Sequence, residues 1–155
     1  MKKFILVYGL VCGLVVITPM IVLTNTATKN GSFEGAMLLG YATMILAFSL
    51  VFVAIRNYRN KYNNGVIGFG KAFKIGLLIV LLASTVYVIG WLIDYYVFLP
   101  DFPDKYAAYE IEKLRASGAT QAALDKQVKE MAEFKEMYKN PAVVVLFTYL
   151  EILPV

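Results

Sequence analysis

Four apolar segments, separated by polar stretches, follow one another along the chain. They cover residues 4–24, 36–55, 75–99 and 142–155. A helix crosses the hydrocarbon core of a bilayer with about 20 apolar residues, each rising about 1.5 Å. The first three segments reach this length, and the fourth is too short. We therefore predict an all-α, polytopic membrane protein with three full transmembrane spans and a partial or short fourth span.

A charged section, residues 101–140, interrupts the apolar pattern. Asp104 is expected to cap a first helix, and Ser117 with Gly118 to end it. Thr120 is expected to cap a second helix. The second helix carries one apolar stripe at helical spacing, formed by Leu124, Val128, Met131, Phe134 and Tyr138. These features predict an extramembrane antiparallel helical hairpin, packed on itself or lying against the outer leaflet.

The composition agrees with residence in a bilayer. Hydrophobic residues make up 59% of the chain, against about 45–50% in soluble domains. No stretch outside the predicted spans is long enough for a catalytic core, so residues 1–155 are treated as one membrane domain. Cys12 is the single cysteine and there is no histidine, so we expect no disulfide within the chain, no metal site and no cofactor.

The first apolar segment admits two other interpretations. Lys2 and Lys3 precede it, as they would a signal peptide, but the apolar run exceeds the 7–15 residues typical of a signal peptide and has no clear cleavage site. A lipoprotein signal is disfavoured because Val11, rather than a small residue, precedes Cys12. We interpret the segment as an uncleaved span.

The basic residues lie mostly at the ends of the spans, which accounts for the net charge of +4 without a nucleic-acid partner. Between Arg56 and Lys74 there are basic residues and no acidic one. The positive-inside rule therefore places this loop and the N-terminus in the cytoplasm and the hairpin 101–140 in the periplasm. Anionic headgroups are the expected partners of four of these cations, Arg56, Arg59, Lys71 and Lys74.

A glycine-rich stretch, residues 65–71, fits the pattern G-x-x-x-x-G-K of a phosphate-binding loop. That loop also needs a Ser or Thr after the lysine and a preceding buried strand. Ala72 occupies the hydroxyl position and no strand is predicted. We interpret the stretch as the entry into the third span rather than as a nucleotide site.

Two pairs of small residues recur at a spacing of four in the first two spans. Gly9 and Gly13 form the first pair, and Ala36 and Gly40 the second. Small-x-x-x-small patterns allow close helix approach, so these are candidate helix-packing positions. The alternative is that glycine is simply frequent in transmembrane helices.

Two carboxylates fall inside apolar segments, and intramembrane ionisable residues are candidates for function. Asp94 lies near the outer end of the third span, where it is expected to reach water or an external lysine; a buried, proton-handling role is the alternative. Glu151 lies about 15 Å along the fourth segment, near mid-membrane. It is the leading functional candidate, and its alternative is a protonated carboxyl bonded to Thr, Tyr or a free carbonyl.

Several short motifs together identify a resemblance that covers nearly the whole chain. They are Tyr8-Gly9-Leu10, Gly40-Tyr41 with Met44, Tyr58-Arg59, Gly65 with Phe69-Gly70-Lys71-Ala72, Tyr87 with Trp91, Phe102 with Tyr106, Tyr138-Lys139-Asn140-Pro141, and Thr148 with Glu151 and Pro154-Val155. The chain resembles the domain of unknown function 4199 (DUF4199) family of small bacterial inner-membrane proteins.

The resemblance implies four spans, both ends in the cytoplasm and a long external helical segment before the last span. It implies no activity. Relatives continue beyond the position of Val155 with a further apolar run, so the fourth span is expected to be truncated here.

Three functions remain open on the sequence. The first is a non-enzymatic accessory or assembly subunit that binds other membrane components, either as a homo-oligomer or with a membrane protein partner. The second is a small homo-oligomeric transporter or proton-coupled carrier that uses Glu151 and Asp94. The third is a lipid-modifying enzyme, which would have only these two carboxylates and the interfacial cations to work with. The lack of a recognisable nucleophile, metal cluster or cofactor motif favours the first.

Overall fold

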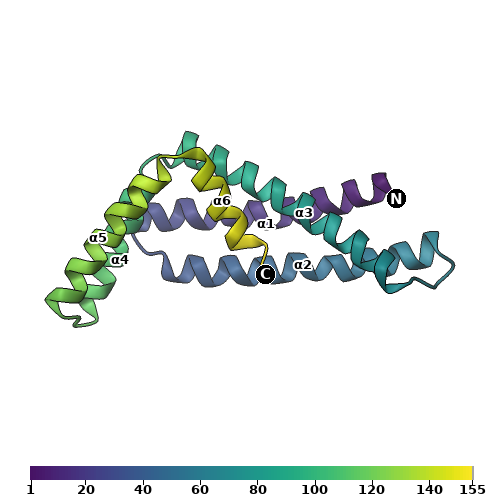
Figure 1. The fold of residues 1–155 in the computed structure, drawn as a ribbon, viewed down its shortest axis with the longest axis horizontal. Coiled ribbons are helices and arrows are strands. Elements are labelled where there is room, and N and C mark those ends of the chain that lie inside the picture. The colour runs from purple at the N-terminus through teal and green to yellow at the C-terminus, as the bar shows by residue number, and fades with distance from the viewer. Residues whose placement is uncertain (155) are drawn as a thin grey trace.

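The structure, a computed structural model, describes residues 1–154, and every regular element in that range is helical. The helices are α1 (Lys2–Asn30), α2 (Glu34–Tyr62), α3 (Phe69–Ile93), α4 (Phe102–Ala116), α5 (Gln121–Tyr138) and α6 (Pro141–Ile152); a π-helical turn, η1 (Asp94–Phe98), continues α3 (Figure 1). Three stretches, α1, α2 and Phe69–Phe98, are long and apolar enough to cross a membrane, and α6 is a shorter apolar helix. The predicted all-α fold with three full spans and a short fourth is confirmed.

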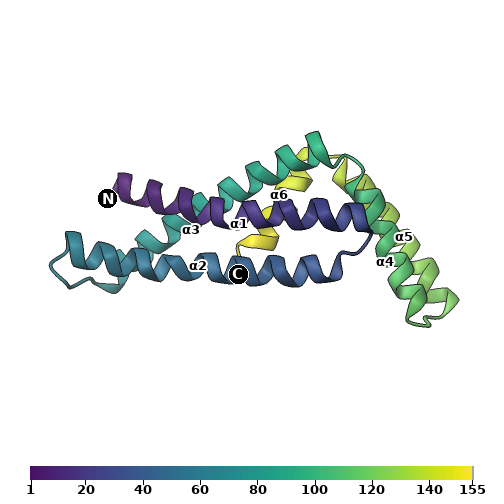
Figure 2. The same ribbon diagram turned by 180° about the vertical axis from the view of Figure 1, so that it is seen from behind.

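The three long helices lie along one another and the hairpin α4–α5 projects from one end of them (Figures 1 and 2). The N-terminus and the α2–α3 link lie together at the opposite end. From the hairpin, α6 turns back along the spans, and its last residue, Ile152, belongs to one buried cluster with Met44 and Ala47 of α2. The molecule therefore has a basic end, a hairpin end and a short helix that covers part of the region between them.

The closest helix packing joins α1 to α3. A Cβ atom added at Gly9 would lie 2.6 Å from Leu82 Cδ2, and one added at Gly13 would lie 2.6 Å from Val86 Cβ. One turn further along, Ile17 of α1 packs against Gly90 of α3, where a Cβ would clash with Ile17 Cγ1. The contacts advance in the same direction along both helices, so α1 and α3 run parallel. The glycines allow the two backbones to approach closely, as small residues do between transmembrane helices.

The second small pair has different surroundings. A Cβ at Gly40 would meet no atom within 4 Å. Both Ala36 and Gly40 line a cavity instead of an interface with a neighbouring helix. Their small side chains leave space, and that space becomes part of the candidate site described below.

The first span is longer than predicted. We expected residues 25–35 to be a polar connection, but α1 continues to Asn30 and only residues 31–33 link it to α2. The polar side chains bond within the helix: Thr26 Oγ1 donates to the Val22 carbonyl at 2.7 Å and Thr28 Oγ1 to the Thr24 carbonyl at 2.7 Å. Gly31 ends the helix in the left-handed conformation, at φ 68°.

The second and third spans also exceed their predicted limits. Beyond Ile55, α2 continues to Tyr62 because its last turns pack on α1: Asn57 donates to the Tyr8 hydroxyl at 2.8 Å, and the Tyr58 ring lies 5.3 Å from the Phe4 ring. The helix α3 begins at Phe69, after Gly68, and not at Ile75. The glycines that precede it form a short link between α2 and α3.

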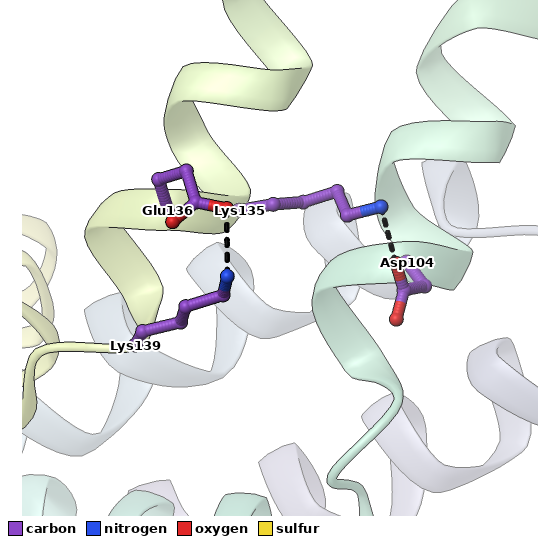
Figure 3. Close-up of polar contacts among 4 residues, drawn as sticks. All are labelled: Asp104, Lys135, Glu136 and Lys139. Atoms are coloured by element: carbon purple, nitrogen blue, oxygen red, sulfur yellow. Dashed lines mark hydrogen bonds and ion pairs between the residues drawn. The ribbon is translucent and has the colours of Figure 1, made fainter.

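The hairpin has the predicted form, with one corrected cap. Thr120 caps α5 as expected, and its Oγ1 accepts from the Ala123 amide at 3.4 Å. Asp104 is not the cap of α4; Asp101 occupies that position, since Pro103 fits the first turn of the helix. Instead, Asp104 pairs with Lys135 of α5 at 2.5 Å, while Lys139 pairs with Glu136 at 2.7 Å (Figure 3). The Lys135 ion pair joins the two helices of the hairpin.

Candidate functional site

A cavity of about 290 Å³ lies where the hairpin meets the spans. All six helices, or the residues that cap them, contribute to its wall. In the order α1 to α6, each helix is represented in the wall by one of the following residues: Met20, Met44, Trp91, Tyr106, Tyr138 and Glu151. The cavity therefore forms only when the three spans, the hairpin and α6 are folded together.

Aromatic rings form half of the cavity wall, and they connect the hairpin to the spans. Phe33, which caps α2, packs edge-on against Phe102 and Tyr106 of α4, with ring centroids 6.0 and 5.6 Å apart. Trp91 of α3 packs edge-on against Phe102 at 5.0 Å. Edge-to-face pairs at these separations each stabilise a fold by about 0.5–1.5 kcal/mol beyond burial. The wall of the cavity is thus also the contact that holds the hairpin.

Two tyrosine hydroxyls of the hairpin, those of Tyr106 and Tyr138, are protonated at neutral pH. Burial, with a smaller effect of the Glu110 carboxylate, raises the pKa of Tyr106 to about 12. Burial likewise raises the pKa of Tyr138, and the Glu151 carboxylate adds to this increase. Both side chains line the cavity, so both offer neutral rings and O–H groups to it.

Among residues 1–154, Glu151 is the one acidic residue on the cavity wall, and no Lys or Arg lines it. It stands at the mouth, where its side chain is left exposed by the protein. Its depth follows from α6: the hydroxyl groups of Tyr149 and Thr85 lie 2.9 Å apart, which fixes the register of α6 on the third span. Thr85 is 13 residues before Phe98, about 20 Å of helix. Glu151 therefore lies beside the middle of the third long helix.

Tyr87 is the polar neighbour of Glu151 inside the cavity. Its side chain is 0% exposed, and its hydroxyl makes no hydrogen bond within residues 1–154. The Glu151 carboxyl lies next to the Tyr87 hydroxyl. A buried hydroxyl without a partner is unfavourable, so the Tyr87 hydroxyl is available to hydrogen-bond an occupant of the cavity.

Asp94 has a different environment from the one expected. It is 2% exposed and accepts two hydrogen bonds from Asn25 Nδ2, at 3.0 and 3.1 Å, rather than reaching water or an external lysine. The prediction failed because Asn25 was assigned to a loop, whereas it faces η1 from within α1. Asp94 does not line the cavity, so the two intramembrane carboxyl groups occupy separate sites.

The four candidate lipid contacts gather at the basic end. Arg56, Lys71 and Lys74 are exposed and Arg59 is partly exposed. Lys71 donates to Asn63 Oδ1 at 2.6 Å and lies 5.4 Å from the centre of the Tyr58 ring. The ion pairs found among residues 1–154 all lie in the hairpin section, between Asp101 and Lys139. None of these four cations is therefore neutralised by a carboxylate of the described chain.

Sequence reasoning missed three residues of these sites. Tyr87 was noted only for the family resemblance, Asn25 was placed in a loop and Phe33 was not singled out. Trp91, one of the motif residues of the family resemblance, is 4% exposed and packs inward. A helical-spacing comparison of Tyr87 with Trp91 places them on one face of α3, which is the available sequence indication. In the described part of the chain, no group of three or more Asp, Glu, Cys or His residues is arranged to hold a metal ion.

The fold and its three spans define a multi-span α-helical membrane protein. Residues 6–155 match a protein family described as "Protein of unknown function (DUF4199)". The chain belongs to this family, as its motifs predicted. No curated protein and no solved structure matches it. Nine of the motif residues line the cavity, among them Tyr41, Tyr87, Trp91, Tyr106 and Glu151.

Proposed function

We propose that the protein is a non-enzymatic accessory or assembly subunit that binds another membrane component in the cavity between the hairpin and the spans. The cavity, built by all six helices, is the observation that carries the proposal. Small-molecule sites are concave, mostly apolar and supplied with a few converging polar groups. Here aromatic rings and methionines supply the apolar wall, and Tyr87 and Glu151 supply the polar groups. An occupant would contact the spans and the hairpin together.

Native mass spectrometry of protein extracted gently from its own membrane tests this proposal. Gly40→Leu adds a side chain into the cavity, whereas Gly35→Leu is a matched change on the same helix outside the wall, where a Cβ also meets nothing within 4 Å. We expect the wild type and Gly35→Leu to retain a stoichiometric lipid or companion protein, and Gly40→Leu to lose it. Equal retention by all three proteins would contradict binding in the cavity.

A second candidate function is a small homo-oligomeric transporter or proton-coupled carrier. The position of Glu151, at mid-span on the cavity mouth, favours it. Ionisable residues at this depth mark ion and proton pathways in many membrane proteins. If this function is correct, the wild-type protein should conduct protons in proteoliposomes with a pH gradient. Glu151→Gln should abolish this proton flux, whereas Glu133→Gln, at an exposed position of the hairpin, should leave it unchanged. Unchanged flux in Glu151→Gln would exclude it.

We also propose a bacterial inner-membrane location, with the N-terminus in the cytoplasm and the hairpin in the periplasm. In support, Lys2 and Lys3 lie at the same end of the molecule as the α2–α3 link with its unpaired cations (Figure 1). An excess of Lys and Arg in short cytoplasmic segments sets orientation. In this orientation Arg56, Arg59, Lys71 and Lys74 face the anionic leaflet, which attracts basic residues near the surface.

A further inference from the structure

The cavity has a chemical asymmetry that restricts what it can bind. Its wall includes eight aromatic side chains, a single carboxyl group, Glu151, and no basic residue. The faces of aromatic rings carry negative electrostatic potential and attract cations, most strongly where water is excluded. An anionic occupant would meet the carboxylate and the ring faces without any compensating cation. The wall therefore favours a positively charged occupant.

Glu151 provides a second reason to expect a cation. Its side chain is exposed at the cavity mouth, at the depth of the middle of the third span. A charged carboxylate at that depth is costly unless it is paired. Residues 1–154 supply no cationic partner, because none of the ion pairs formed in that range includes Glu151. An occupant that carries the counter-charge would remove this cost.

Tyr87 narrows the class of cation. Its hydroxyl is fully buried, lines the cavity and makes no hydrogen bond in the described chain. A hydroxyl oxygen accepts hydrogen bonds, as does a carboxylate. The two groups approach each other from α3 and α6, so one N–H-bearing group between them could donate to both. A metal cation fits less well, because the remaining wall offers rings and thioethers where hard cations require several oxygen ligands.

From these observations we propose that the cavity binds an organic ammonium ion with apolar substituents. The ammonium group lies between Glu151 and Tyr87 and donates a hydrogen bond to each, while Trp91 and the rings of the hairpin enclose the apolar part. This inference rests on the proposed function, since it identifies the chemical class of the component bound there. The ammonium has two possible sources: a lipid headgroup or a free amphipathic amine.

Trp91 allows binding to be measured directly, because it is the only tryptophan of the chain and lines the cavity. The probe is 1-adamantylammonium, and its neutral match is 1-adamantanol, which has the same rigid apolar body. Each is titrated into the full chain in phosphatidylglycerol nanodiscs, whose headgroups carry no ammonium, and Trp91 fluorescence is recorded. We expect saturable binding of the ammonium with an affinity about tenfold higher than that of the alcohol, because an ion pair with Glu151 and contacts with the ring faces add to the binding free energy.

Two carboxylate variants locate the preference. Glu151→Gln keeps the size of the side chain but removes its charge, so this variant should bind the ammonium and the alcohol about equally. Glu133→Gln removes an exposed carboxylate of the hairpin and should keep the tenfold preference for the ammonium over the alcohol. Circular dichroism is used to check that both variants are folded. A third variant, Tyr87→Phe, should weaken the binding of the ammonium and leave the binding of the alcohol unchanged. Equal binding of both probes by the wild type, no binding of either, or a preference that survives in Glu151→Gln would overturn the proposal.

The lipid composition distinguishes the two sources. Replacing part of the phosphatidylglycerol with phosphatidylethanolamine should weaken the apparent probe affinity if the occupant is a lipid headgroup, and leave it unchanged if the occupant is a free amine. Both results support an ammonium site. If the wild type binds the two probes equally while Gly40→Leu still loses its retained component, the proposed function stands and the ammonium inference fails.

Discussion

Asn25 donates hydrogen bonds from its Nδ2 to both carboxylate oxygens of Asp94, at 3.0 and 3.1 Å. The two residues are 69 positions apart in the sequence. They join the last third of α1 to the π-helical turn that ends the third span. Because Asp94 is 2% exposed, this amide replaces the water that the carboxyl group would otherwise bind. The pair fixes the hairpin end of the spans next to the cavity.

Asn25→Ala should therefore destabilise the protein. It leaves Asp94 buried without its hydrogen-bond donor, and hydrogen bonds to charged groups contribute about 1.5–3 kcal/mol. We expect the free energy of unfolding, measured by SDS titration in mixed micelles, to fall by about this amount. Asn30→Ala, at the exposed end of the same helix, is the control and should change stability by less than about 0.5 kcal/mol. Equal effects of the two variants would contradict the structural role of the pair.

The glycines of the first two spans should respond in opposite ways to the same substitution. Gly13→Ala places a methyl group 2.6 Å from Val86 Cβ, so α1 and α3 must separate, at a cost of about 1–3 kcal/mol. Gly40→Ala meets nothing within 4 Å and gains helix propensity, so stability should stay the same or rise by up to about 1 kcal/mol. The same SDS titration compares the two. A Gly13→Ala protein as stable as the wild type would contradict the close packing of α1 on α3 at Gly13, and a loss in Gly40→Ala would contradict the open surroundings of Gly40.

The architecture was predictable from the sequence because the length of each apolar run reports directly on the bilayer. The ends of the helices were less predictable. Polar residues near the end of α1, namely Asn25, Thr26 and Thr28, are typical of loops. In α1, however, the side chains of all three donate hydrogen bonds to carbonyls of the preceding turn, and Asn25 also donates to Asp94. Polar composition alone does not distinguish these two uses of the same residues.

The candidate site was predictable only in part. Glu151 stood out because a lone carboxylate in an apolar run is rare. The residues that surround Glu151 could not be identified from the sequence, because the cavity forms from segments as distant in sequence as Phe33 and Tyr138. Trp91 is buried in the cavity wall because Phe102 of the hairpin packs against it. Such contacts depend on tertiary structure, which periodicity does not contain.

The stability of the protein should decline at alkaline pH through Tyr106. Its pKa is raised to about 12 in the folded state, mainly by burial, against about 10 in an unfolded chain. The folded state therefore holds this proton more tightly, so its contribution is fully present below pH 10 and is lost as pH rises toward 12. Unfolding titrations across this range should show a shallower decline in Tyr106→Phe than in the wild type. Tyr62→Phe, at a ring that is 62% exposed, is the control and should follow the wild type.

The proposed orientation of the chain leads to a labelling prediction, because each end of the molecule carries an exposed polar residue. Ser117, between α4 and α5, is exposed, as is Asn60 near the end of α2. The natural Cys12 is 0% exposed and gives little background. In intact cells, a membrane-impermeant maleimide should label Ser117→Cys and should label Asn60→Cys only after the membrane is opened. The reverse pattern would place the hairpin in the cytoplasm and Arg56, Arg59, Lys71 and Lys74 outside, which would remove the anionic leaflet as the partner of these cations.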